Sequence, residues 1–280
     1  MKLIADCGST KIDWALCDYE KCVEMFNSPG VNPVFMNQGE IAKSFSEAFE
    51  GYLTGNKYIR EVFFYGAGCV GKNAEKVAQV LEEIFPDALV VVCSDLVGAA
   101  RALLNRKEGI ACILGTGSNS CLFDGENIVS NIPPLGFVLG DEGSGAVLGK
   151  LLVNKMYKGQ TGNELRLAFE QETGLTLPDI ISNVYHSTMP SRFLASLVAF
   201  ASRHIDDKAV ERIVIDNFAS FIENNVAAYG RRDLPVSFVG GMSLNFEKQL
   251  RRVVSDAGYT LGTILAKPIG GLVDFHLTAS

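Results

Sequence analysis

The sequence has few of the residues that build metal and disulfide sites. It contains three histidines and one tryptophan, and its seven cysteines include no Cys-x-x-Cys pair. The histidines lie far from every cysteine along the chain, at His186, His204 and His276. Since structural zinc sites use closely spaced Cys and His ligands, we expect no zinc site. The odd number of cysteines, several of them inside apolar runs, favours buried free thiols.

Long apolar runs and an excess of basic residues are also missing. No apolar stretch approaches the roughly 18 residues of a membrane span, and the N-terminal residues do not have the pattern of a signal peptide, so we expect a cytoplasmic protein without membrane contact. The net charge of -7 argues against a nucleic-acid partner, because phosphate backbones require clustered Lys and Arg. It does not argue against a nucleotide, which backbone N–H groups and Mg²⁺ can hold locally.

The expected strands and helices follow the same order in both halves of the chain. The first half predicts strands at 2–7, 12–16, 24–27, 62–65 and 88–93, with helices at 41–53, 74–85 and 96–104. The second half predicts strands at 110–114, 120–123, 127–131, 236–239 and 260–265, a helix-rich region at 143–229, and helices at 243–257 and 271–277. This repetition indicates two related α/β domains, 1–107 and 108–280, that face each other across a cleft. We keep open that the last helix, 271–277, packs on the first domain. The alternative is one continuous α/β sheet.

The first repeat opens with a tight turn of small residues, Gly8, Ser9, Thr10 and Lys11, between two strands. Such a turn exposes backbone N–H groups and lets a phosphate approach closely, while the hydroxyls and Lys11 add hydrogen bonds and charge. Asp6 at the end of the preceding strand is placed to hold Mg²⁺, through water. The alternative is an ordinary hairpin, and the Walker spacing is absent.

The second repeat has a similar turn, Gly115, Thr116, Gly117 and Ser118. We align Gly8-Ser9 with Gly117-Ser118, because apolar residues run up to the turn in both halves. Two such turns in equivalent positions predict that a phosphate chain is held from both sides.

Three further motifs contain polar or glycine residues at strand and helix ends. Asp95 follows a buried strand, where carboxylates often lie in the ligand crevice, although it could serve as the N-cap of a helix from Leu96. The glycine-rich stretch 136–145 surrounds Asp141 and Glu142, whose carboxylates suit sugar hydroxyls; a helix entry with acids at its positive end explains the acids but not the glycines. A glycine pair, Gly240-Gly241, would let a flat ring lie against the backbone, or form a plain turn.

Together these motifs resemble the BadF/BadG-type ATPase family, and within it the N-acetylglucosamine kinase-like proteins. The resemblance spans essentially the whole chain and is carried by DCGSTKIDW, GTGSNS and GFVLGDEGSGAVLG. It implies the duplicated ribonuclease H-like fold of actin, hexokinase and Hsp70, and an ATP- and Mg²⁺-dependent amino-sugar kinase that converts N-acetylglucosamine to its 6-phosphate.

The resemblance also implies roles for individual residues. Asp6 with 8–11 matches the first phosphate loop, 115–118 the second, and 240–241 the adenosine-binding glycines. Asp95 matches the catalytic base. Asn32 and Asp141 match residues that bind the sugar.

The sequence departs from amino-sugar kinases of this type at one point. These often carry a tryptophan before the acidic pair, where this chain has Leu135. Two alternative functions stay open: an ATPase activator of an acyl-CoA dehydratase or reductase, which would hold an iron–sulfur cluster with exposed cysteines, and a non-catalytic sugar sensor. The sequence identifies neither the sugar nor the oligomeric state, and a homodimer stays open.

Overall fold

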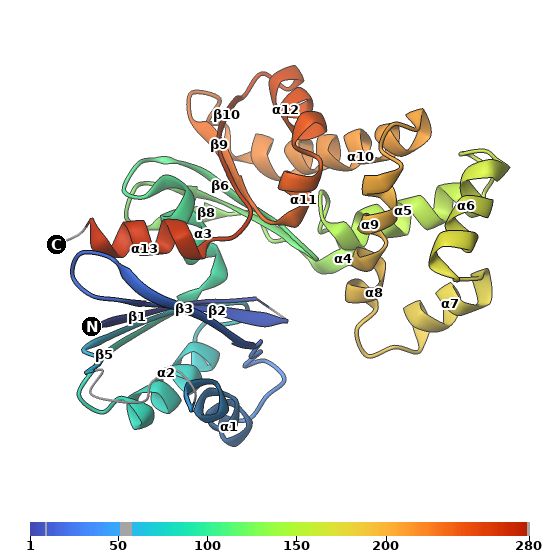
Figure 1. Cartoon of the computed structure of the whole chain (residues 1–280). Coiled ribbons are helices and arrows are strands. Elements are labelled where there is room, and N and C mark those ends of the chain that lie inside the picture. Colours follow the sequence, from blue (N-terminus) through green and yellow to red (C-terminus); the bar gives the residue numbers. More distant parts are fainter. Residues whose placement is uncertain (9, 51–57, 279–280) are drawn as a thin grey trace. The chain divides into compact units, whose positions relative to one another are not determined.

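The computed structural model describes residues 1–8, 10–50 and 58–278, which form two compact units (Figure 1). Unit 1 comprises Met1–Lys107, Asp124–Ile128 and Lys267–Ser280; unit 2 comprises Glu108–Phe123 and Val129–Ala266. Along the sequence, most of unit 2 is therefore inserted between segments of unit 1. Within the described ranges, no helix combines the length and the apolar character needed to cross a membrane.

The sheet of unit 1 has five strands in the order β3-β2-β1-β4-β5. These strands are β1 (Lys2–Cys7), β2 (Lys11–Cys17), β3 (Cys22–Pro29), β4 (Glu61–Gly66) and β5 (Leu89–Ser94). The central strand β1 pairs antiparallel with β2 and parallel with β4, and β4 pairs parallel with β5. The last residues of the three parallel strands, Cys7, Gly66 and Ser94, are in register, so these strands end at one edge of the sheet.

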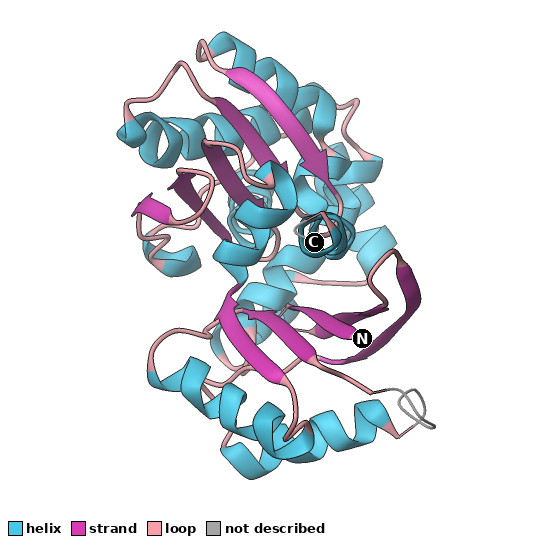
Figure 2. Ribbon diagram, turned by 90° about the vertical axis from the view of Figure 1, so that its left-hand side faces the viewer, coloured by secondary structure: helices cyan, strands magenta, loops and turns pink. Residues whose placement is uncertain are grey.

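Helices lie on both faces of this sheet (Figure 2). They are α1 (Gln38–Phe49), α2 (Lys72–Ile84), α3 (Asp95–Leu104) and α13 (Ile269–Leu277). Leu3 and Ala5 of β1 pack with α1 and α2, whereas Ile4 packs with α13, which also contacts α3. Because side chains alternate along a strand, Asp6 points to the face that α3 and α13 cover.

Unit 2 repeats this sheet in the order β8-β7-β6-β9-β10. The strands are β6 (Gly109–Leu114), β7 (Ser118–Phe123), β8 (Ile128–Asn131), β9 (Pro235–Val239) and β10 (Thr260–Leu265). Again the first strand is central, with an antiparallel partner on one side and a parallel partner on the other. The duplicated fold predicted from the sequence is therefore confirmed, and the alternative of one continuous sheet is wrong.

The helices of unit 2 surround a second apolar core. They are α4 (Gly136–Leu139), α5 (Gly145–Tyr157), α6 (Asn163–Thr173), α7 (Leu177–Tyr185), α8 (Pro190–Ser196), α9 (Val198–Arg203), α10 (Lys208–Phe221), α11 (Gly241–Asn245) and α12 (Glu247–Asp256). A π-helical turn, Ile222–Val226, and a 3₁₀ turn, Ala227–Tyr229, continue α10. Buried residues of α5, α10 and α12 pack in one core with those of β6 and β9.

Two details of the sequence prediction are wrong. The helix expected at 243–257 is two helices, because Phe246 has φ -124° and ψ 36° and turns its buried ring into the core. The alignment of Gly8 with Gly117 is wrong by two residues. Gly8 directly follows β1 and Gly115 directly follows β6, whereas Ser118 already belongs to β7 and pairs with Leu114. The helix expected at 41–53 is α1, whose last residue is Phe49, and residues 51–53 lie outside the described residues.

Candidate active site

Asp6 and Asp95 lie at the same edge of the unit 1 sheet, where the parallel strands end. Asp6 precedes the last residue of β1, and Asp95 directly follows Ser94, the last residue of β5. The pKa of Asp6 is raised to about 7, first because burial disfavours the charged carboxylate, and then because the carboxylates of Asp13 and Asp95 repel it. Lys267 opposes this shift. The edge is thus an enclosed acidic cluster with an incomplete balance of positive charge.

Asp95 does not cap α3. The N-cap is Ser94, whose Oγ accepts a hydrogen bond from the Val97 N–H at 3.4 Å. Asp95 is the first helical residue, and its Oδ1 accepts from the Leu96 N–H at 3.0 Å. The capping alternative for Asp95 is therefore wrong. Burial raises the pKa of Asp95, partly offset by backbone N–H donors, and a raised pKa makes its carboxylate a stronger base.

Asp13, which the sequence analysis did not single out, joins two lysines to this cluster. It lies opposite Asp6 in the β1–β2 ladder. Lys11 Nζ lies 2.9 Å from Asp13 Oδ1, and Lys267 Nζ lies 3.1 Å from Asp13 Oδ2. Asn27 Nδ2 donates to Asp13 Oδ1 at 2.6 Å. The lysine predicted to contact phosphate is thus in an ion pair. The sequence signal for Asp13 was an acidic residue inside an otherwise apolar run.

The first phosphate-loop candidate is a tight hairpin packed against the segment that carries Asn32. Gly8 N–H donates to Lys11 C=O at 3.0 Å, and Gly30 N–H donates to Thr10 C=O at 2.9 Å. A Cβ on Gly30 would lie only 2.7 Å from hairpin backbone atoms, so this close approach requires glycine. Ser9 lies outside the described residues.

Asn32 has a structural role in its own loop. Its Oδ1 accepts from the Val34 N–H at 3.0 Å, and its C=O accepts from the N–H groups of Phe35 and Met36. Phe35 is 82% exposed beside it. The loop thus presents Asn32 next to an exposed aromatic ring.

In unit 2, the second phosphate-loop candidate and Asp141 are in contact. Burial, the largest influence, raises the pKa of the Asp141 carboxylate, while the neighbouring backbone N–H groups of Ser118 and Gly136 lower it. A Cβ on Gly117 would lie 3.1 Å from Asp141 Oδ2. Asp141 has a positive φ of 54°, so its backbone is in the left-handed region. The structure therefore brings Gly117, Ser118 and Asp141 together.

Gly115 and Gly241 line one cavity of about 450 Å³ in unit 2. The other lining residues are small or apolar apart from three polar side chains; they are Thr116, Gly145, Ala195, Ser196, Val198, Ala199, Met242 and Asn245. The neighbouring Gly240 has φ +123°, and a Cβ there would contact the Leu114 carbonyl oxygen. Glycine is therefore required at 240, whereas a Cβ on Gly241 would meet no atom within 4 Å. A cavity that joins a phosphate-type loop to a glycine pair suits a nucleotide.

Leu135 and Glu142 flank Asp141 in different environments. Leu135 is 63% exposed and has φ 63°, a left-handed conformation that is unusual for leucine. Glu142 accepts hydrogen bonds from Asn224 Nδ2 at 3.1 Å and from Asn225 Nδ2 at 3.5 Å. No spacing rule links Glu142 to these asparagines, and the sequence analysis did not find them.

Comparison with known proteins identifies structural relatives. No family model matches the chain, and no curated protein matches it. A candidate N-acetylglucosamine kinase from Porphyromonas gingivalis is 44% identical, with a TM-score of 0.96 and 99% of each chain covered. A candidate N-acetylglucosamine kinase from Chromobacterium violaceum is 18% identical, with a TM-score of 0.72 and 98% of each chain covered. ROK hexokinase from Thermus thermophilus is 14% identical, with a TM-score of 0.57 and 99% of each chain covered, and supports the fold alone.

The two repeated sheets, the loops that follow their central strands and the 44% identity over 99% of the chain agree with one another. The chain therefore belongs to the N-acetylglucosamine kinase-like family, which has the duplicated actin/hexokinase-like fold.

Proposed function

We propose that this protein transfers the γ-phosphoryl group of ATP to an amino sugar, with N-acetylglucosamine as the substrate and its 6-hydroxyl as the acceptor. The 44% identity to a candidate N-acetylglucosamine kinase supports this assignment most strongly. The enclosed carboxylates at the strand ends of unit 1 supply chemistry that suits it, because phosphoryl transfer requires a positioned acceptor and a base.

Asp95 is the proposed general base. Its carboxylate accepts the proton of the sugar hydroxyl as the hydroxyl oxygen bonds to the γ-phosphorus and the bond to the ADP oxygen breaks. Burial raises the pKa of Asp95, which increases the basicity of its carboxylate. Asn32 and Asp141 would bind sugar hydroxyl or acetamido groups, since they offer fixed donors and acceptors.

The acidic cluster fits a divalent cation. Asp6 has a raised pKa in the protein alone, so a bound cation would relieve the repulsion from Asp13 and Asp95. Among the described residues, no group of three His, Cys, Asp or Glu side chains is arranged to hold a metal ion directly. Asp6 would therefore bind Mg²⁺ through water, with most ligands supplied by phosphate and water oxygens. When bound, Mg²⁺ neutralises charge on the phosphates.

The segments proposed to hold the phosphates of ATP are 8–11 and 115–118, because backbone N–H groups in turns of small residues suit an anion. The cavity lined by Gly115, Gly241, Met242 and Asn245 suits the adenosine.

An assay of ADP release across N-acetylglucosamine, glucosamine, N-acetylmuramic acid, N-acetylmannosamine and glucose tests the proposal, with the product identified by mass spectrometry. We expect N-acetylglucosamine to give the highest kcat/KM and a 6-phosphate product. Stimulation by none of the sugars, with an iron–sulfur cluster in protein prepared anaerobically, would replace the kinase with an electron-transfer ATPase. Sugar binding without turnover would indicate a sensor.

A further inference from the structure

The glycine-rich loop that carries Asp141 is held residue by residue by α10 and the π-helical turn that follows it. Asn217 and Phe221 lie four residues apart on α10 and therefore share one helix face. Asn217 is buried; its Oδ1 accepts from the Gly143 N–H at 2.9 Å and its Nδ2 donates to the Ser144 C=O at 3.2 Å. A Cβ on Gly143 would lie 2.9 Å from Phe221 Cβ, so the helix and the loop are in close contact there.

The π-helical turn extends this contact to Glu142. Asn225 lies four residues beyond Phe221 and is also buried, while Asn224 is exposed. The two side-chain amides donate to different oxygens of the Glu142 carboxylate, Asn224 to Oε1 and Asn225 to Oε2. Hydrogen bonds to a charged acceptor are stronger than those between neutral groups. Successive residues of the loop, Glu142 to Ser144, thus contact the π-helical turn and α10.

The held loop is strained at its functional residue. Asp141 has φ 54°, a region that non-glycine residues rarely occupy and that persists only where surrounding contacts stabilise it. The carboxylate of Asp141 points back to Ser118 and Gly136, whereas the next residue, Glu142, bonds the π-helical turn. The two adjacent acids therefore have different partners.

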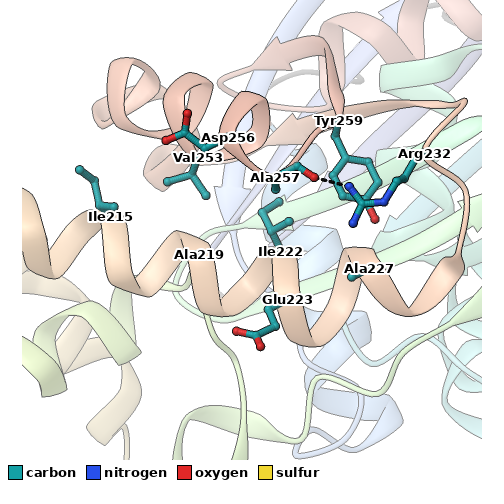
Figure 3. Close-up of a pocket in the computed structure, with 10 residues that line it drawn as sticks. All are labelled: Ile215, Ala219, Ile222, Glu223, Ala227, Arg232, Val253, Asp256, Ala257 and Tyr259. Carbon is teal, nitrogen blue, oxygen red and sulfur yellow. Dashed lines mark hydrogen bonds between the residues drawn. The ribbon is translucent and has the colours of Figure 1, made fainter.

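The π-helical turn also has an apolar side, where Ile222 and Val226 are buried in the core of unit 2. Ile222, Glu223 and Ala227 line a cavity of about 400 Å³ there, together with Arg232 and Tyr259 (Figure 3). Single π-helical turns are uncommon and occur frequently at functional sites. The polar contacts of the turn to the loop are those of Asn224 and Asn225 with Glu142.

We infer that Glu142 is a positioning residue rather than a sugar ligand, and that Asn224 and Asn225 hold it so that Asp141 keeps its left-handed conformation toward the substrate. This inference rests on the proposed sugar kinase activity for its kinetic consequences. It divides the acidic pair into Asp141, which contacts the sugar, and Glu142, which acts through the loop.

Two leucine substitutions in the same turn test this. Asn224→Leu removes a side chain that donates to Glu142. Glu223→Leu introduces the same leucine one position earlier, on the side of the turn that faces the cavity, and is the matched control. We expect Asn224→Leu to lower kcat/KM for the sugar about tenfold and to leave the KM for ATP within about twofold, since one charge-assisted hydrogen bond is lost. Glu223→Leu should behave as wild type. Equal effects of the two substitutions would overturn the inference.

A reversed pair separates positioning from direct contact. Glu142→Gln and Asn224→Asp each place like groups opposite one another, amide against amide or carboxylate against carboxylate. In the double variant, the amide introduced in the loop can donate to the carboxylate introduced in the turn and accept from Asn225. We therefore expect kcat/KM to return to within about threefold of wild type. If Glu142 itself binds the sugar, the double variant will be no better than the worse single variant.

Hydrogen–deuterium exchange of residues 136–150 gives a readout without turnover. Asn224→Leu should accelerate exchange there, and Glu223→Leu should not. If wild-type protein phosphorylates no sugar, the proposed function fails, and exchange alone then decides the positioning role. Unchanged exchange in Asn224→Leu would overturn it.

Discussion

Lys267 Nζ lies 3.1 Å from Asp13 Oδ2, which joins the segment before α13 to the second strand of unit 1. Lys11 contacts the same carboxylate at 2.9 Å. Asp13 therefore has two ammonium partners, whereas Asp6 opposite it feels only the weaker, opposing influence of Lys267. Burial and the neighbouring carboxylates therefore disfavour the ionisation of Asp6.

The first prediction concerns Asp6 and the pH dependence of stability. Its pKa of about 7 exceeds the ordinary value of 3.8, so between these values the folded protein keeps a proton that the unfolded chain has released. Stability should therefore fall as pH rises through this window, by roughly 2 to 4 kcal/mol from this group. Asp6→Asn removes this loss, and its free energy of unfolding relative to wild type should increase from pH 5 to pH 8.

Urea unfolding at several pH values measures this difference. Asp87→Asn, which changes an exposed acid of the same unit, is the control. Lys267→Met should extend the wild-type loss to higher pH, because Lys267 lowers the pKa of Asp6. A pH-independent difference for Asp6→Asn would mean that this carboxylate ionises normally.

The second prediction concerns Asp95. Asp95→Asn keeps the shape of the side chain and the Ser94 cap, but lacks a base, so kcat should fall by about 10² to 10⁴ while nucleotide binding persists. In wild type, the acidic limb of kcat should lie above the usual aspartate range, because burial raises the Asp95 pKa. Turnover within threefold of wild type would remove Asp95 from the chemistry.

The third prediction compares adjacent glycines. Gly240→Ala would force a left-handed residue and a contact with the Leu114 carbonyl oxygen, so it should destabilise the protein by roughly 2 kcal/mol or more. Gly241→Ala meets open space and should leave the melting temperature nearly unchanged while raising the KM for ATP, since its methyl group enters the cavity. Melting curves and ATP titrations distinguish the two; similar melting temperatures would contradict the prediction.

The fourth prediction concerns the thiols. All seven cysteines are described and free, and the five buried ones are Cys7, Cys17, Cys69, Cys112 and Cys121. Burial raises the pKa of the Cys7, Cys17, Cys69 and Cys121 thiols to about 12, so these should react with Ellman's reagent only after denaturation. The half-buried Cys22 should react first, and Cys22→Ser should remove that phase. Fast reaction of five thiols in native protein would show that burial does not protect them.

Local patterns in the sequence were sufficient to predict the repeat. Apolar runs that end in glycine or Asp predicted the strands, because the side chains of a buried parallel strand are almost all apolar. The end of α2 was predicted within one residue, because Pro86 cannot continue the helix. The expected alignment of Gly8 with Gly117 was wrong, because similar residue types do not show at which residue the strand pairing begins.

The candidate site was harder to predict wherever it depends on distant residues. Asp13 and Lys267 are 254 positions apart, and Asn224 lies 82 positions from Glu142. Such pairs have no periodic signature in a single sequence. The π-helical turn is equally hidden, because the buried residues of α10 follow ordinary helical spacing up to Phe221.

Helix α13 follows unit 2 along the chain, yet it covers a face of the first sheet, where Leu272 and Val273 pack with Ile4 and Tyr65. During synthesis, that face would therefore be covered by α3 without α13 until the intervening 138 residues of the larger unit 2 segment, Val129–Ala266, have been made. Contacts of such long sequence separation slow folding and leave hydrophobic surface open to other chains. The arrangement therefore leaves part of the first sheet open to misassociation for as long as the synthesis of unit 2 takes.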